Sequence, residues 1–161
     1  MGNTLSVGLG EQAISRNPTD ILVAYGLGSC LGIGMYDPVT HVAGLAHAVL
    51  PENSNGTDPN PGKFVDTGIK LLIEQMVKAG ANRNRLTVRM AGGANMLVSA
   101  SLSKTFDIGS RNIQSAHVTF NLINMKIANE EVGGNTGRTV RMYVDSGRMT
   151  VRVIGGQEHD I

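Results

Sequence analysis

Short apolar segments separated by turn-forming residues fill the first third of this chain, and they constrain its fold more than any other feature. Each segment is typical of a β-strand. The dipeptides Asn17-Pro18 and Asp37-Pro38 interrupt the pattern, because proline, asparagine and aspartate favour turns. We therefore predict that this third is mostly β-structure, with strands over residues 5–9, 21–25, 31–36 and 42–50.

The rest of the chain mixes helices with further strands. Between residues 63 and 79, apolar residues recur three and four positions apart, which predicts an amphipathic helix that packs against a sheet and ends at Gly80. No linker-like stretch or internal repeat divides the sequence, so we expect one compact mixed α/β domain over residues 1–161. The other predicted elements are a helix over 111–121 and strands over 86–91, 125–132, 139–144 and 149–154, the last two forming a hairpin.

Composition narrows the possible classes of function. Of the 161 residues, 41% are hydrophobic and 17% are charged, as is ordinary for a globular protein with a sizeable core. A net charge of +1 and scattered arginines do not indicate a nucleic-acid surface. No apolar run reaches the roughly 18 residues of a membrane span, and the N-terminus lacks the features of a secretory signal. A single cysteine excludes an intrachain disulfide and fits a reducing compartment, so we expect a cytoplasmic protein that is neither inserted nor exported.

Several short motifs match known binding patterns only superficially. The first six residues fit the loose N-myristoylation pattern, which is often accidental. Residues 8–13 resemble a dinucleotide-binding fingerprint, but no strand of useful length precedes them and no long helix follows. Gly62-Lys63 is followed by Phe64 and not by the serine or threonine of a phosphate-binding loop. The four histidines lack the spacing of a helical zinc motif, so we expect no nucleotide, cofactor or metal.

The only cysteine, Cys30, has the setting of a nucleophile. It closes a turn in which glycines let the backbone bend sharply and bring bare N–H groups near a substrate carbonyl, so we expect Gly28 and Ser29 to help bind the oxyanion. His47 lies in the middle of another predicted strand, where it could take the thiol proton if the two strands lie side by side. We expect the imidazolium to lower the thiol pKa from its ordinary value of about 8.5.

Two further segments are candidate walls of this site. A second glycine-rich turn follows the strand predicted over 86–91, and there the backbone could approach a ligand. We therefore include Gly92, Gly93 and Asn95 among the candidate substrate-binding residues. The polar loop over residues 51–62 either borders the site or merely connects two elements.

Both central residues also have a plainer interpretation. An unpaired cysteine most often serves as a small buried hydrophobe. His47 lies among apolar neighbours and could be a core histidine bonded to a backbone carbonyl. The sequence has one cysteine, a glycine turn directly before it and a histidine on a separate predicted strand. Together these features make the nucleophile-and-base interpretation about as favoured as the interpretation as core residues.

Short motifs, many of them rich in glycine, follow one another in order along nearly the whole chain. They are Gly26-Leu27-Gly28-Ser29-Cys30, Gly44-Leu45-Ala46-His47 with Leu50-Pro51, Pro61-Gly62-Lys63-Phe64, Ala91-Gly92-Gly93-Ala94-Asn95-Met96, Ile108-Gly109-Ser110-Arg111-Asn112 and Gly133-Gly134-Asn135. Each motif alone is weak, but the series resembles the CheD family of chemoreceptor glutamine deamidases.

The resemblance implies hydrolysis of particular glutamine side chains to glutamate on methyl-accepting chemotaxis receptors, with Cys30 as nucleophile and His47 as base. It also implies a mixed α/β fold in which helices flank packed sheets, and binding to a CheC-type phosphatase in which residues 96–106 take part. The family usually has a threonine six residues before the cysteine that orients the histidine, and here that residue is Ala24. Either another group, such as a backbone carbonyl or a water, then orients His47, or the ring is held more loosely than in its relatives, and we expect lower activity.

Two other functions stay open from the sequence. The replacement at Ala24 favours a binding module for receptors and a CheC-type phosphatase with weak or no catalysis. The same thioester chemistry would also suit a cysteine hydrolase that acts on another amide or on an ester, such as a receptor methyl ester.

Overall fold

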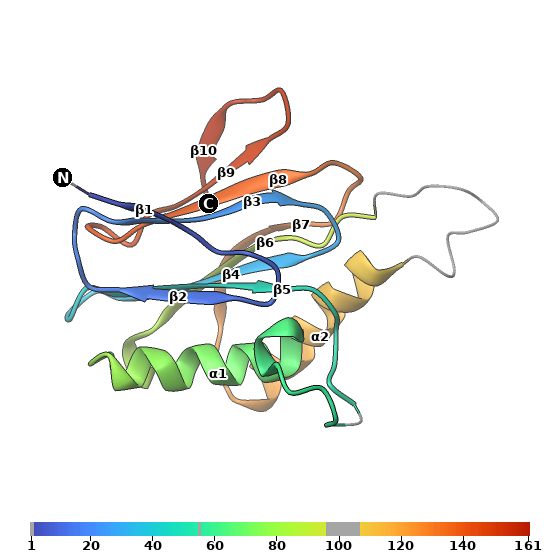
Figure 1. Cartoon of the computed structure of the whole chain (residues 1–161), viewed down its shortest axis with the longest axis horizontal. Helices are drawn as coiled ribbons and strands as arrows, with labels where there is room; N and C mark the ends of the chain where they lie inside the picture. The colour runs from blue at the N-terminus through green and yellow to red at the C-terminus, as the bar shows by residue number, and fades with distance from the viewer. Residues whose placement is uncertain (1, 55, 96–106) are drawn as a thin grey trace.

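The computed structural model describes residues 2–54, 56–95 and 107–161, and in this part of the chain two five-stranded sheets are stacked on one another (Figure 1). We call the sheet that lies between the other sheet and the helices the central sheet, and its partner the outer sheet. The outer sheet has the order β1 (Thr4–Ser6), β3 (Ile21–Leu27), β8 (Arg138–Tyr143), β9 (Met149–Val153) and β10 (Glu158–Asp160). The central sheet has the order β2 (Gln12–Ser15), β5 (Val42–Ala48), β4 (Leu31–Asp37), β6 (Thr87–Gly92) and β7 (Ile127–Val132).

Helices α1 (Val65–Lys78) and α2 (Ile108–Leu122) cover the face of the central sheet that points away from the outer sheet (Figure 1). Short 3-10 helices, η1 (Pro61–Lys63) and η2 (Arg83–Arg85), precede α1 and β6. Apolar residues of α1, such as Ile69 and Leu72, join buried residues of β4, β5 and β6 in one core cluster. In the described residues, no helix combines the length and the apolar character needed to cross a membrane.

The central strands are buried on both faces, so alternate residues enter two different cores. Along β5, Ala46 and Ala48 belong to the core beneath the helices, whereas Ala43 and Leu45 belong to the core between the sheets. His47 is therefore on the side of the outer sheet, because successive side chains of a strand point to opposite faces. A glycine at position 34 lets the sheets approach, since a Cβ there would lie 2.5 Å from Cε of Met142.

The predicted mixed α/β fold, with packed sheets flanked by helices, is confirmed. Gly80 follows the last turn of α1 with φ of +110°, as expected of a residue that ends a helix. The strand predicted over 5–9 is shorter in the structure, where β1 ends at Ser6. The reason is that the chain turns after β1 and enters β2 at Gln12. Sequence reasoning missed β2 and β10, each at the edge of its sheet; β10 has no apolar residue to reveal it.

Candidate active site

The turn that carries Cys30 connects the two sheets. Residues 28–30 link β3 of the outer sheet to β4 of the central sheet, so Cys30 immediately precedes β4. Its side chain is half-buried and packs against the apolar cluster between the sheets. The thiol thus lies at one end of the interface between the sheets.

His47 lies on the strand next to Cys30 and on the same side of the sheet. Strands β4 and β5 are antiparallel neighbours, with Gly32 opposite His47. Cys30 lies two residues before Gly32, which makes Cys30 and His47 diagonal neighbours, typically about 7–8 Å apart between Cα atoms. The two strands named from the sequence are not neighbours in one sheet, because β3, which precedes Cys30, belongs to the outer sheet and β5 to the central sheet. It is β4, which follows Cys30, that lies beside β5.

A backbone carbonyl orients the His47 ring. Nδ1 lies 2.8 Å from the carbonyl oxygen of Val7, which can only accept a hydrogen bond, so Nδ1 donates and the neutral ring has its lone pair on Nε2. The Val7 N–H in turn donates to Val23 at 2.8 Å, which holds this segment beside β3. The side chain of His47 is 5% exposed, and Nε2 has no hydrogen-bond partner among the described residues. In the neutral ring, Nε2 is thus a buried nitrogen that can accept a hydrogen bond.

Burial raises the pKa of the Cys30 thiol above its ordinary value, and the residue's own backbone N–H opposes this only in part. We expected the opposite from the sequence. The reason is that the half-buried sulfur loses hydration and forms no ion pair with His47 in the described structure. The resting thiol is therefore neutral near pH 7.

Each of the three carbonyls of the turn over residues 28–30 accepts a hydrogen bond. Gly28 accepts from the Ala94 N–H at 2.9 Å and Cys30 from the Gly93 N–H at 2.8 Å, while Ser29 accepts from Nδ2 of Asn112 at 2.8 Å. In contrast, the N–H groups of Gly28 and Ser29 donate to no acceptor within the described part of the chain. The turn is thus fixed through its oxygens, which leaves N–H donors available to bind negative charge.

The second glycine-rich turn packs directly on the first. Gly92 and Gly93 have φ of +112° and +66°, and a Cβ on Gly92 would lie 2.2 Å from the carbonyl oxygen of Cys30. The Gly93 N–H is used by Cys30, so these glycines brace the turn that carries the thiol. Asn95 donates from Nδ2 to Oγ of Ser110 at 3.0 Å, and its Oδ1 is buried and unpartnered among the described residues.

Asn112 of α2 is a site residue that sequence reasoning did not assign. It is fully buried, and its Nδ2 donates to the carbonyl of Ser29 and, at 3.0 Å, to that of Val49. It thereby joins the turn before β4 to the segment after β5. The available signals were its place in the helix predicted over 111–121 and in the motif Ile108-Gly109-Ser110-Arg111-Asn112.

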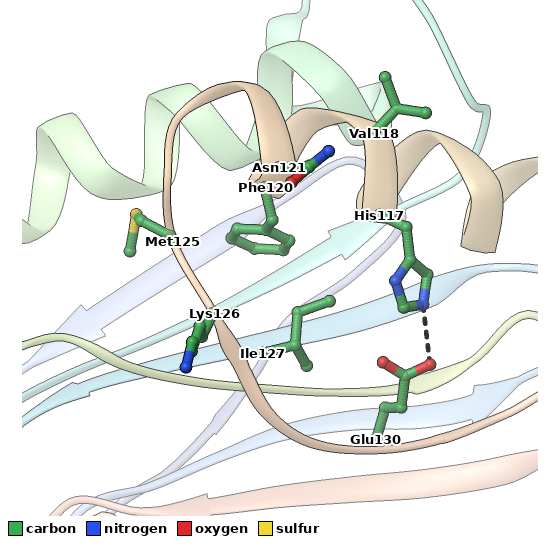
Figure 2. A pocket seen from close by; sticks show the side chains of 8 residues that line it. All are labelled: His117, Val118, Phe120, Asn121, Met125, Lys126, Ile127 and Glu130. Carbon is green, nitrogen blue, oxygen red and sulfur yellow. Dashed lines mark hydrogen bonds and ion pairs between the residues drawn. The ribbon is translucent and has the colours of Figure 1, made fainter.

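A separate groove of about 510 Å³ lies between α2 and the segment leading into β7 (Figure 2). In Figure 2, His117 and Glu130 point toward one another, and Nε2 of the histidine lies 2.9 Å from Oε1 of the glutamate. None of the predicted site residues lines this groove.

The described residues contain no group of three or more acidic, histidine or cysteine side chains that could hold a metal. The partner-binding residues predicted over 96–106 lie outside the described residues.

Cysteine-dependent hydrolases as a class pair a cysteine with a histidine, and here the two residue types lie on a glycine turn and a nearby strand, with no hydrogen bond to Nε2 of His47 among the described residues. The chain belongs to the CheD family: the family described as "CheD chemotactic sensory transduction" matches residues 49–153. This confirms the resemblance seen in the sequence motifs.

Known relatives are similar over nearly their whole length. The "Chemoreceptor glutamine deamidase CheD" of Thermotoga maritima is 40% identical over 152 residues, which is 94% of this chain and 93% of the relative. The "Probable chemoreceptor glutamine deamidase CheD" of Symbiobacterium thermophilum is 39% identical over 97% of this chain and 96% of the relative.

Among solved structures, the crystal structure of Bacillus licheniformis hypothetical protein YfiH aligns with 77% of this chain and with 51% of the YfiH chain. The TM-score is 0.47 and the sequence identity is 13%.

Proposed function

We propose that this protein is a chemoreceptor glutamine deamidase in which Cys30 is the nucleophile and His47 the base. The observation that carries the proposal is the unpartnered Nε2 of a buried, carbonyl-oriented His47 on the strand and face next to Cys30. The names of the relatives supply the substrate, which is the side-chain amide of glutamines on chemoreceptors. We place this reaction in the cytoplasm, because a reducing compartment keeps the Cys30 thiol reduced.

The first half of the reaction releases ammonia. Because the resting thiol is neutral, its proton passes to Nε2 of His47 as the sulfur attacks the carboxamide carbon. The oxyanion that develops accepts from the free N–H groups at Gly28 and Ser29. The imidazolium then gives its proton to the departing nitrogen, the C–N bond breaks, and a thioester to Cys30 remains.

The second half restores the enzyme. His47 takes a proton from water, whose oxygen attacks the thioester carbon. The C–S bond breaks, the imidazolium returns the proton to the sulfur, and the receptor retains a glutamate in place of the glutamine. Throughout, the Val7 carbonyl stabilises the imidazolium by accepting from Nδ1.

The second glycine-rich turn completes the substrate site in this proposal. Gly92 and Gly93 are buried and packed against Cys30 and Ile113, so in this proposal they hold the turn that carries the thiol in place. Oδ1 of Asn95, which has no partner among the described residues, accepts from the substrate carboxamide N–H. A CheC-type phosphatase is the second partner that we propose, on the family resemblance alone.

The test is the conversion of receptor glutamines to glutamates by the wild type and by the Cys30→Ala and His47→Ala variants. A cytoplasmic receptor fragment is the substrate, and the mass increase of its peptides is the readout. We expect both variants to lose activity, whereas His117→Ala, which changes an exposed histidine away from this site, retains it. An inert wild type that still binds the receptor fragment or the phosphatase would identify a binding module, and hydrolysis of methyl esters alone would identify an esterase.

A further inference from the structure

The peptide unit between Gly92 and Gly93 is held at both of its polar ends. Its N–H donates to the carbonyl of Cys30 at 2.8 Å. Its carbonyl accepts from the N–H of Gly133 at 3.0 Å and from Nη1 of Arg138 at 3.0 Å. One peptide plane therefore connects the guanidinium of Arg138 to the main chain of Cys30.

Arg138 reaches this peptide from the other sheet. It is the first residue of β8, is 7% exposed, and pairs through its main chain with Leu27, directly before the turn that carries Cys30. Its Nε lies 3.3 Å from Oε2 of Glu131 on β7, an ion pair without the alignment of a hydrogen bond. Oε1 of the same glutamate pairs with Nε2 of His159 on β10. A guanidinium is costly to bury unless it is paired, and here a carboxylate and a carbonyl provide the partners.

The motif Gly133-Gly134, to which the proposed chemistry gives no role, belongs to the same arrangement. Both glycines have positive φ, +86° and +74°, and a Cβ on Gly134 would lie 3.6 Å from Nη2 of Arg138. Gly133 donates to the carbonyl of Gly92, and Gly134 accepts from the N–H of Asn95 at 2.9 Å. The motif lets the backbone pass beside the guanidinium and holds the second glycine-rich turn from its other side.

We propose that Arg138, paired with Glu131, is a positioning residue that sets the Cys30 thiol for attack. This inference rests on the proposed function, because it assigns Arg138 a part in placing the nucleophile. Donation from the guanidinium polarises the Gly92–Gly93 peptide and strengthens its hydrogen bond to Cys30. Without that donation the turn loosens, and misplacement of a reacting atom by about 1 Å can lower a rate by about 100-fold.

The test compares Arg138→Met, Arg138→Lys and the control Arg141→Met in receptor deamidation. We expect Arg138→Met to lower kcat at least about tenfold and to leave KM within about twofold, because the residue places the thiol and does not bind substrate. The lysine variant recovers part of kcat, since an ammonium can still donate to the Gly92 carbonyl. Arg141 is on the same strand but the opposite face, so its variant keeps the wild-type rate. A folded Arg138→Met variant with kcat within twofold of wild type, or a lysine variant no better than the methionine variant, overturns the proposal.

Two further measurements cover the remaining outcomes. If Arg138→Met fails to fold, the Glu131→Gln variant tests the positioning role instead. We expect the kcat of this variant to fall about threefold, because the guanidinium loses its counter-charge. An unchanged kcat in that variant overturns the proposal.

If the wild type is inert, the rate at which iodoacetamide alkylates Cys30 tests the positioning role. We expect the thiol of the folded Arg138 variants to react at least about threefold faster than that of the wild type, because a loosened turn exposes the thiol. Activity that persists in Cys30→Ala contradicts the proposed function itself, whereas an inactive Cys30→Ala beside a fully active Arg138→Met contradicts only the positioning role.

Discussion

The Val7 carbonyl provides His47 with the acceptor that the alanine at position 24 cannot provide. A main-chain acceptor fixes the tautomer of the ring as a side chain would, because either one requires Nδ1 to carry the proton. It depends on no particular residue type at the accepting position. The departure at Ala24 therefore does not by itself favour a binding module over an enzyme.

At this scale we predict that Ala24→Thr gives no increase in deamidation rate. The Nδ1 proton that a threonine hydroxyl would accept is already bonded to Val7, and Ala24 is fully buried in the core between the sheets. The added atoms overfill this core, so we expect the free energy of unfolding in urea to fall by about 1–3 kcal/mol. Ala24→Val adds similar volume without a hydroxyl and is the matched control. A several-fold faster threonine variant, with the valine variant unimproved, would show that the hydroxyl does orient His47.

At the scale of elements, apolar periodicity predicted the long strands and α1 well, because their residues face one or two cores. Edge strands such as β10 were missed, since they are held by main-chain pairing and polar contacts. Cys30, His47 and the two glycine turns were predicted as site residues because each has a recognisable residue type and a local setting. Val7 and Asn112 were not assigned, because their roles depend on which strands and helices lie side by side.

Helix α2 contributes to the site through Asn112, and we predict that Asn112→Ala weakens both the fold and the catalysis. The change leaves the partly buried carbonyls of Ser29 and Val49 without the donor they share. We expect a loss of about 1–3 kcal/mol in the free energy of unfolding and a lower deamidation rate, because the turn that carries Cys30 is no longer tied to the end of β5. Asn121→Ala changes the same residue type at an exposed position of α2 and should alter neither. Urea unfolding and the receptor assay measure the two effects, and equal behaviour of the two variants would contradict this role.

At the scale of the whole molecule, the candidate site is assembled from both sheets. The turn that carries Cys30 passes from β3 to β4, the acceptor for His47 of the central sheet follows β1 of the outer sheet, and Arg138 of the outer sheet reaches Gly92 of the central sheet. No single sheet contains the thiol, the imidazole and the groups that orient them. The geometry that we propose for catalysis therefore requires the two sheets to be packed together, and conditions that weaken the fold also disrupt the candidate site.

Acid is one such condition, because Asp37 is an ionised carboxylate with a fully buried side chain at the end of β4. Nη2 and Nε of Arg85 lie 3.0 and 3.1 Å from its two oxygens, and the N–H groups of Asn82 and Val39 donate to it at 2.8 and 2.9 Å. The hydrogen bonds from Arg85, followed by those from the backbone, hold the pKa of this carboxyl well below its usual range. Since the folded pKa lies below the unfolded value of about 4, the stabilisation is complete above that value and is lost as the pH falls below it.

We therefore predict that Asp37→Asn lowers the free energy of unfolding by about 2–3 kcal/mol near pH 7, where the wild-type carboxylate is ionised in both the folded and the unfolded state. As the pH falls from about 5 toward 2, the wild type loses this advantage and the two stability curves converge. Urea unfolding across that range measures the difference. Asp145→Asn, at an exposed turn between β8 and β9, should follow the wild-type curve. Parallel curves for Asp37→Asn and the wild type would mean that the carboxylate does not contribute to the acid sensitivity of the fold.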